Sequence, residues 1–194
     1  MDNFDLDKME DKELVAEYLA GQEEILPYLI NKHIKSVYRF VYGLIIDKNT
    51  TEDITQEVFV KVWKKIKGYK EKYSFKTWLF SIARNTVIDY WRKKKDVAFS
   101  EFDSVDGGNI LEDTLADDQP SAEEVFSKVE DQKVFNETLK KLSPLYREVL
   151  LLKYADDLSI EEIAKVLNRP VETVKSQHYR GVMHLKKLLL RIKL

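Results

Sequence analysis

The stretch from Leu158 to Leu190 constrains the fold most, because it predicts two helices joined by a tight turn. Ser159 followed by Glu162 forms a capping box, so the first helix is expected to begin directly after the serine. Asn168 tolerates the left-handed conformation that ends a helix, and Pro170 fits the first turn of the next helix. A short helix that braces a longer one suits insertion of the longer helix into the DNA major groove. The alternative for this stretch alone is an ordinary helical hairpin.

The second helix of this pair has one apolar side and one side that is rich in hydrogen-bond donors. Steps of three and four residues mark the apolar side, which consists of Val174, His178, Gly181, Leu185 and Leu188. The other side carries the candidate DNA contacts Thr173, Lys175, Ser176, Tyr179 and Arg180.

Composition narrows the remaining possibilities. The chain has 194 residues, of which 44% are hydrophobic and 34% charged, with 6 glycines and 4 prolines, which favours an almost all-helical protein. The absence of cysteine excludes disulfides and cysteine-based zinc sites, and it fits a reducing cytoplasm. No apolar run is long enough to span a bilayer. The 3 histidines are scattered and no glycine-rich phosphate loop occurs, so we expect no enzyme, metal or cofactor.

Upstream, the sequence predicts a loose acidic tail followed by amphipathic helices. The tail covers residues 1–11, and the helices cover residues 12–20, 23–46, 51–67 and 75–94. In the third helix, which Thr50 is expected to cap, the apolar residues are Ile54, Val58, Val62 and Ile66, with Phe59 and Trp63 widening the stripe. Its other side carries Asp53, Gln56, Glu57 and Val60, which form either a solvated face or a surface for a protein partner.

A run of cations and aromatic rings lies at the junction of the third and fourth helices. Seven lysines occur between Lys61 and Lys76, interleaved with rings such as Tyr69 and Tyr73. Cations follow phosphates and rings stack on unpaired bases, so the mixture suits single-stranded nucleic acid. The alternative is that the rings belong to the core. On the fourth helix one face holds Ser81, Arg84, Asn85, Ile88 and Arg92.

The character of the chain changes between Asp96 and Gln119, where eight acidic residues occur without a lysine or arginine. Such a segment is extended by its own charge and predicts a flexible linker. Capping signals then predict a helix to about Lys141 and another from Pro144 to Tyr154. We therefore expect an all-α chain of two small helical domains, 1–95 and 121–194, joined by an acidic linker at 96–120.

In this order, these parts resemble the extracytoplasmic-function sigma factors of the sigma-70 family. The resemblance covers nearly the whole chain. Its strongest pieces are TEDITQEVFVKVWKKI (51–66), FKTWLFSIARNTVIDYWRKKK (75–95), LSPLYREVLLLKY (142–154) and the helix-turn-helix.

The resemblance implies a non-enzymatic, cytoplasmic subunit that directs RNA polymerase to promoters, with core polymerase, promoter DNA and an anti-sigma factor as partners. Asp53, Gln56, Glu57 and Val60 would bind the polymerase clamp. The −10 element would be melted and held by Tyr69, Lys72, Tyr73, Lys76, Phe80, Ser81, Arg84, Asn85 and Arg92. The −35 element would be read by Thr173, Lys175, Ser176, Gln177, Tyr179 and Arg180, with the polymerase flap on the other side of that domain.

This sequence departs from the family pattern at four positions of the helix-turn-helix. Gln177, His178 and Val182 stand where the family often has arginine, an aliphatic residue and arginine. Fewer cations predict weaker phosphate binding at the −35 element. Because His178 lies on the apolar stripe, we interpret it as a half-buried, hydrogen-bonded histidine rather than a DNA contact. Arg169 replaces a hydrophobic residue of the turn, and no part of the sequence explains it.

Two other classes of protein fit part of the pattern. A stand-alone helix-turn-helix regulator would bind duplex operator DNA tightly by itself, whereas a sigma factor needs core polymerase. A pure interaction protein would use its basic faces for a protein partner. Its binding to DNA would depend weakly on salt, because each phosphate contact adds roughly 0.9 to the log–log salt slope.

Overall fold

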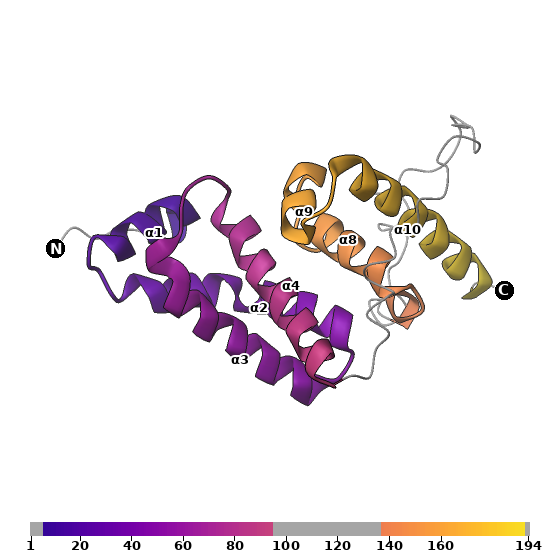
Figure 1. Cartoon of the computed structure of the whole chain (residues 1–194), viewed down its shortest axis with the longest axis horizontal. Helices are drawn as coiled ribbons and strands as arrows, with labels where there is room; N and C mark the ends of the chain where they lie inside the picture. The colour runs from indigo at the N-terminus through magenta and orange to yellow at the C-terminus, as the bar shows by residue number, and fades with distance from the viewer. Residues whose placement is uncertain (1–5, 95–136, 193–194) are drawn as a thin grey trace.

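The computed structural model describes residues 6–94 and 137–192, and every regular element in these two ranges is helical. They form an N-terminal unit (6–94) and a C-terminal unit (137–192), which lie side by side in Figure 1. The predicted linker at 96–119 lies outside the described residues. Most of the helix predicted before Lys141 does too, although residues 137–140 are helical.

The N-terminal unit is built around one long central helix, α2. Its elements are η1 (Leu6–Lys8), α1 (Asp11–Leu19), α2 (Ile25–Ile45), α3 (Lys48–Lys65), η2 (Ile66–Gly68) and α4 (Phe75–Lys94). Helix α2 packs against α1, α3 and α4. Its buried stripe includes Leu29, Val37, Phe40 and Val41, as the spacing of apolar residues predicts.

Two local predictions for this unit are wrong. Asp47, rather than Thr50, caps α3: its Oδ2 atom accepts a hydrogen bond from the Thr50 backbone N–H at 2.8 Å. The end of the predicted acidic tail is anchored rather than loose. Tyr28 of α2 donates a hydrogen bond to Asp7, and Lys32 donates one to the Met9 carbonyl at 3.1 Å.

The C-terminal unit contains the predicted helix-turn-helix. Its helices are α8 (Pro144–Tyr154), α9 (Ile160–Leu167) and α10 (Val171–Ile192). The Ser159 Oγ atom accepts from the Glu162 backbone N–H, and the Glu162 carboxylate accepts from the serine N–H, so the capping box is confirmed. Asn168 ends α9 with a φ of 51°, the left-handed conformation expected there.

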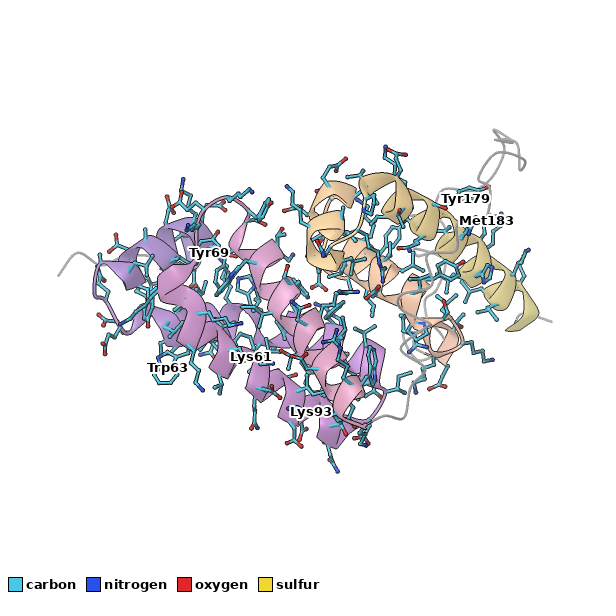
Figure 2. The ribbon with its side chains drawn as sticks, in the orientation of Figure 1. Lys61, Trp63, Tyr69, Lys93, Tyr179 and Met183 are labelled. Atoms are coloured by element: carbon cyan, nitrogen blue, oxygen red, sulfur yellow. The ribbon has the colours of Figure 1, made fainter. Side chains whose placement is uncertain are left out.

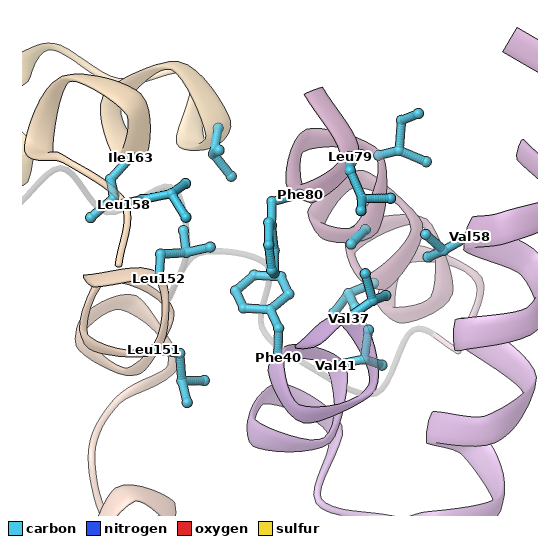
Figure 3. Packing of buried hydrophobic residues seen from close by; sticks show 14 of the residues in the cluster. Val37, Phe40, Val41, Val58, Leu79, Phe80, Leu151, Leu152, Leu158 and Ile163 are labelled. Carbon is cyan, nitrogen blue, oxygen red and sulfur yellow. The ribbon is translucent and has the colours of Figure 1, made fainter. Parts of the chain in front are cut away.

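The two units share one continuous hydrophobic core. Helix α8 packs on α2, and α9 packs on α4. Figure 3 shows Phe40 and Phe80 facing Leu152 and Leu158 of the other unit. The two rings meet edge to face, with centroids 5.3 Å apart. The prediction of two helical units is therefore confirmed, and the structure adds a packed interface between them.

Candidate protein and nucleic-acid interfaces

The face of α3 that points away from the core combines acidic and apolar side chains. Asp53, Gln56 and Glu57 are exposed, and Val60 is 46% exposed. Trp63, which the sequence placed on the buried stripe, is 58% exposed and points away from the body of the protein (Figure 2). That expectation was wrong. The exposure of Trp63 could have been predicted from its spacing of three residues from Val60, because this spacing places the indole on the same side as the acidic residues.

An ion-pair network borders this face. The Lys61 Nζ atom lies 2.9 Å from the Glu57 carboxylate and 3.5 Å from that of Asp89 on α4, and it donates to the Thr86 hydroxyl at 3.2 Å. The lysine therefore holds the adjoining parts of α3 and α4 together. The side of Glu57 that faces away from the lysine remains available to a partner.

The loop between α3 and α4 rests on an aromatic cluster. The Tyr69 ring packs against Phe75 and Trp78 at centroid distances of 5.9 and 5.3 Å, and its hydroxyl donates to the Tyr73 carbonyl at 2.7 Å. Burial raises the pKa of Tyr69, as do the nearby carboxylates. Tyr69, one of the two rings predicted to stack on bases, therefore supports the loop instead. Tyr73 remains 37% exposed.

Cations surround the exposed Tyr73 ring. Lys72 lies over it with Nζ 5.4 Å from the ring centroid, and Lys165 of α9 approaches to 4.6 Å. The two lysines place positive charge beside the ring. On α4 itself, the side chains of Asn85 and, near the end of the helix, Arg92 are also exposed.

The remaining candidates on α4 lie at or under the interface with the C-terminal unit. Phe80 is fully buried. Ser81 is half-buried and donates to the Thr77 carbonyl at 2.8 Å. Lys76 donates to the Asp156 carbonyl, and Arg84 is 9% exposed with its Nε atom 3.2 Å from the Glu148 carboxylate. Lys76 and Arg84 therefore each contact the C-terminal unit, and Arg84 is buried there.

The outer side of α10 carries most of the candidate DNA contacts of the helix-turn-helix. Lys175 is exposed and Tyr179 is 49% exposed, whereas Thr173, Ser176 and Arg180 are half-buried. Figure 2 shows Tyr179 and Met183 along this helix. Lys175 pairs with Glu172 at 2.9 Å, which places an anion beside the cation at the start of the helix.

Gln177, the remaining candidate, is buried and belongs to a polar network. Its Oε1 atom accepts a hydrogen bond from Arg169 at 3.1 Å, and the same Arg169 Nη1 atom lies 2.6 Å from the fully buried carboxylate of Glu148. A buried carboxylate requires a paired cation. This pairing explains the arginine at position 169, which the sequence left open, because Arg169 neutralises Glu148. Gln177, predicted to contact DNA, instead accepts one of the arginine's hydrogen bonds.

His178 lies where the sequence predicted. Its Nε2 atom is 2.7 Å from the Tyr154 hydroxyl, and its ring stacks on that tyrosine with centroids 5.6 Å apart. The interpretation as a half-buried, hydrogen-bonded histidine is confirmed.

Within the described ranges, 6–94 and 137–192, no group of histidine or acidic side chains is arranged to hold a metal ion. Nor does any helix in these ranges have the length and apolar character needed to cross a membrane.

Comparison with known proteins gives two family matches. Residues 29–97 match sigma-70 region 2, and residues 133–185 match sigma-70 region 4. Among curated proteins, the ECF RNA polymerase sigma factor SigW of Bacillus subtilis is 31% identical over 180 residues, covering 92% of this chain and 96% of SigW. SigX of the same organism is also 31% identical, covering 85% of this chain and 84% of SigX.

Two solved structures are similar in fold. CnrH in complex with the cytosolic domain of CnrY gives a TM-score of 0.64 at 23% identity, covering 92% of this chain and 96% of that one. The sigma factor RpoE bound to the anti-sigma factor NepR, from Bartonella quintana, gives 0.61 at 25% identity, covering 82% of this chain and 93% of that one.

Proposed function

Because the chain belongs to the extracytoplasmic-function sigma factors of the sigma-70 family, and is therefore an RNA polymerase sigma factor, we propose which of its surfaces bind core polymerase, the −10 element and the −35 element. We retain the boundaries 1–95 for polymerase and −10 binding, 96–120 for the linker, and 121–194 for −35 binding. The observation that carries the proposal is the chemical difference between three surfaces. These are the acidic and apolar face of α3, the cationic, aromatic surface of the following loop and α4, and the donor-rich side of α10.

The polymerase clamp binds the exposed face of α3. Carboxylates at Asp53 and Glu57 attract a basic partner, and Gln56 supplies hydrogen bonds. We add Trp63, because an exposed indole next to Val60 offers the apolar anchor that buried centres of interfaces contain.

The −10 strand binds the loop and α4. Tyr73 is the base-stacking ring, and Lys72, Asn85 and Arg92 hold the strand at the exposed positions. Lys76 and Arg84 also bind the strand once the C-terminal unit is displaced. Ser81 lies between Lys76 and Arg84 on the same helix. Tyr69 acts by positioning the loop. Phe80 is left out of the direct contacts because its ring is fully buried in the core.

The −35 element is read by α10. Lys175, Ser176, Tyr179 and Arg180 approach the major groove, and Thr173 lies at the helix start. Gln177 is left out of the base contacts, since its side chain is buried and bound to Arg169. The opposite side of the C-terminal unit serves the polymerase flap.

We also propose an anti-sigma partner and a place in the cytoplasm. One of the similar structures named above is a sigma factor in complex with an anti-sigma factor. Such a partner would bind the free chain and keep it from core polymerase. Sigma factors are regulatory DNA-binding subunits, and we assign no catalytic residue.

Run-off transcription with bacterial core polymerase on a pool of random promoter sequences tests the function. The expected result is RNA from a subset of templates that requires both this chain and the core enzyme. The stand-alone regulator, which family membership does not favour, predicts tight binding to duplex DNA without polymerase. Promoter-dependent RNA that forms equally well without this chain would refute the proposal.

A further inference from the structure

We propose that Lys12 of α1 is a positioning residue for the loop between α3 and α4, and that it acts through an ion pair with Glu71 of that loop. This role rests on the proposed function of Tyr73, which is to stack on a base of the −10 strand. It adds the N-terminal helix to the parts of the chain that determine how this base is held.

Glu71 is the single acidic residue between Lys61 and Lys76, a run that contains seven lysines. A carboxylate repels the phosphates that these lysines attract, so it weakens DNA binding unless a cation neutralises it. The Lys12 Nζ atom lies 3.0 Å from the Glu71 carboxylate and comes from a different helix. The ion pair therefore neutralises the one carboxylate of the loop and ties the loop to α1.

The ion pair is formed at a tight turn of the loop. The Lys72 backbone N–H donates to the Lys70 carbonyl at 2.7 Å, so the chain bends sharply at Glu71. The Tyr69 hydroxyl closes the loop by donating to the Tyr73 carbonyl at 2.7 Å. The ion pair thus fixes the middle of the loop, and the tyrosine hydroxyl joins its two ends.

The backbone that carries Lys12 is fixed by its neighbour Asp11. The Asp11 carboxylate lies 2.9 Å from Lys32 Nζ and 2.8 Å from His33 Nε2, both on α2. Burial opposes ionisation of Asp11, but these two partners outweigh it and lower its pKa from 3.8 to about 2. The carboxylate is therefore ionised at neutral pH, and the first turn of α1 stays attached to the central helix.

His33 connects this attachment to the start of α4. Its side chain is buried, and its ring lies 5.6 Å from that of Phe75, which packs in turn against Tyr69. The beginning of α1 therefore reaches the loop by two routes, the ion pair at Glu71 and the row of rings that ends at Tyr69. A loop that is held before the strand arrives loses less conformational entropy when the strand binds.

The ion pair itself adds little to the stability of the fold. The side chains of Lys12 and Glu71 are 70% and 55% exposed, and exposed pairs are weak because water and salt screen them. Variants at both positions are therefore expected to fold normally. The effect of the pair is expected in the placement of the Tyr73 ring, which is measurable as the strength of base stacking.

Removal of one base from the −10 strand measures that stacking. Core polymerase loaded with this chain is titrated against two fluorescein-labelled non-template strands from a promoter found by run-off transcription, one of which has a single abasic site. The two strands have the same phosphates, so general charge effects cancel in the ratio of their dissociation constants. For the base that stacks on Tyr73 we expect a ratio of about five to 150. Tyr73→Ala identifies that base, because it brings the ratio close to one.

The test of Lys12 is a reversal of the ion pair. Lys12→Glu and Glu71→Lys should each lower the ratio by about two- to fivefold, since each brings two like charges together. The double variant restores an ion pair in the opposite direction and should recover the natural ratio, as should Lys12→Arg alone. Lys35→Glu, at an exposed position of α2, is the control for charge and should leave the ratio unchanged.

The outcomes separate this inference from the proposed function. An unchanged ratio in both single variants would overturn the role of Lys12, and so would a double variant that does not recover. If Tyr73→Ala changes the ratio at no base of the −10 strand, the proposed stacking fails and the role of Lys12 fails with it. Transcription that requires this chain tests the sigma function independently of both.

Discussion

Asp156 makes the stability of the protein depend on pH, with a size and sign that follow from its surroundings. Its side chain is buried between the two units, where Ser36 and Arg39 of α2 and Lys76 of α4 face it, and the exposed Asp157 follows it in the chain. Burial raises the pKa of Asp156 from 3.8 to about 6, although Arg39 and Lys76 counteract the change. The packed chain therefore holds this proton more tightly than the unfolded chain does.

We expect Asp156→Asn to stabilise the protein at neutral and alkaline pH. The shift of about 2.2 pKa units corresponds to a penalty of about 3 kcal/mol for the ionised carboxylate at pH 8. As the pH falls through 6 the natural side chain takes up its proton. The advantage of asparagine then drops to roughly 1.6 kcal/mol at pH 5 and nearly vanishes below pH 4. Stability that comes from protonation is thus gained as the pH falls.

Urea unfolding of both proteins at pH 8 and pH 5 measures this difference directly. The matched control is Asp157→Asn, which removes the same charge at an exposed neighbour whose φ of 53° asparagine also adopts. A less stable Asp156→Asn protein at pH 8 would refute the reasoning, as would a stability difference that does not change with pH.

Three further predictions concern the proposed surfaces. Glu57→Lys should lower the affinity for core polymerase by about tenfold or more, measured by fluorescence anisotropy, because it reverses a charge at the proposed interface. Glu23→Lys, at an exposed position outside α3, should change that affinity little. Arg180→Ala should cost about 1–3 kcal/mol of binding on promoters with a strong −35 sequence, and an equal loss on all sequences would make Arg180 a phosphate contact only. Arg169→Leu should destabilise the protein by about 3 kcal/mol in urea, since Glu148 loses a buried partner, and unchanged stability would contradict the proposed pairing.

The sequence alone predicted the parts of the fold that depend on local chemistry. Ser159 caps α9 and Asn168 ends it, because both effects involve atoms within a few residues of one another. Helical spacing also identified the outward side of α3. It failed for Trp63, because an apolar side chain next to a buried stripe looks the same whether a neighbouring helix covers it or not.

Polar residues of the site were harder to predict than apolar ones, for a related reason. Nothing near Arg169 in the sequence shows that its partner is Glu148, which lies on α8 and is itself buried. Gln177 likewise looked like a base contact, because its place on α10 is next to residues that face outward. Which side of a helix carries a polar residue follows from the sequence, but what lies opposite depends on tertiary packing.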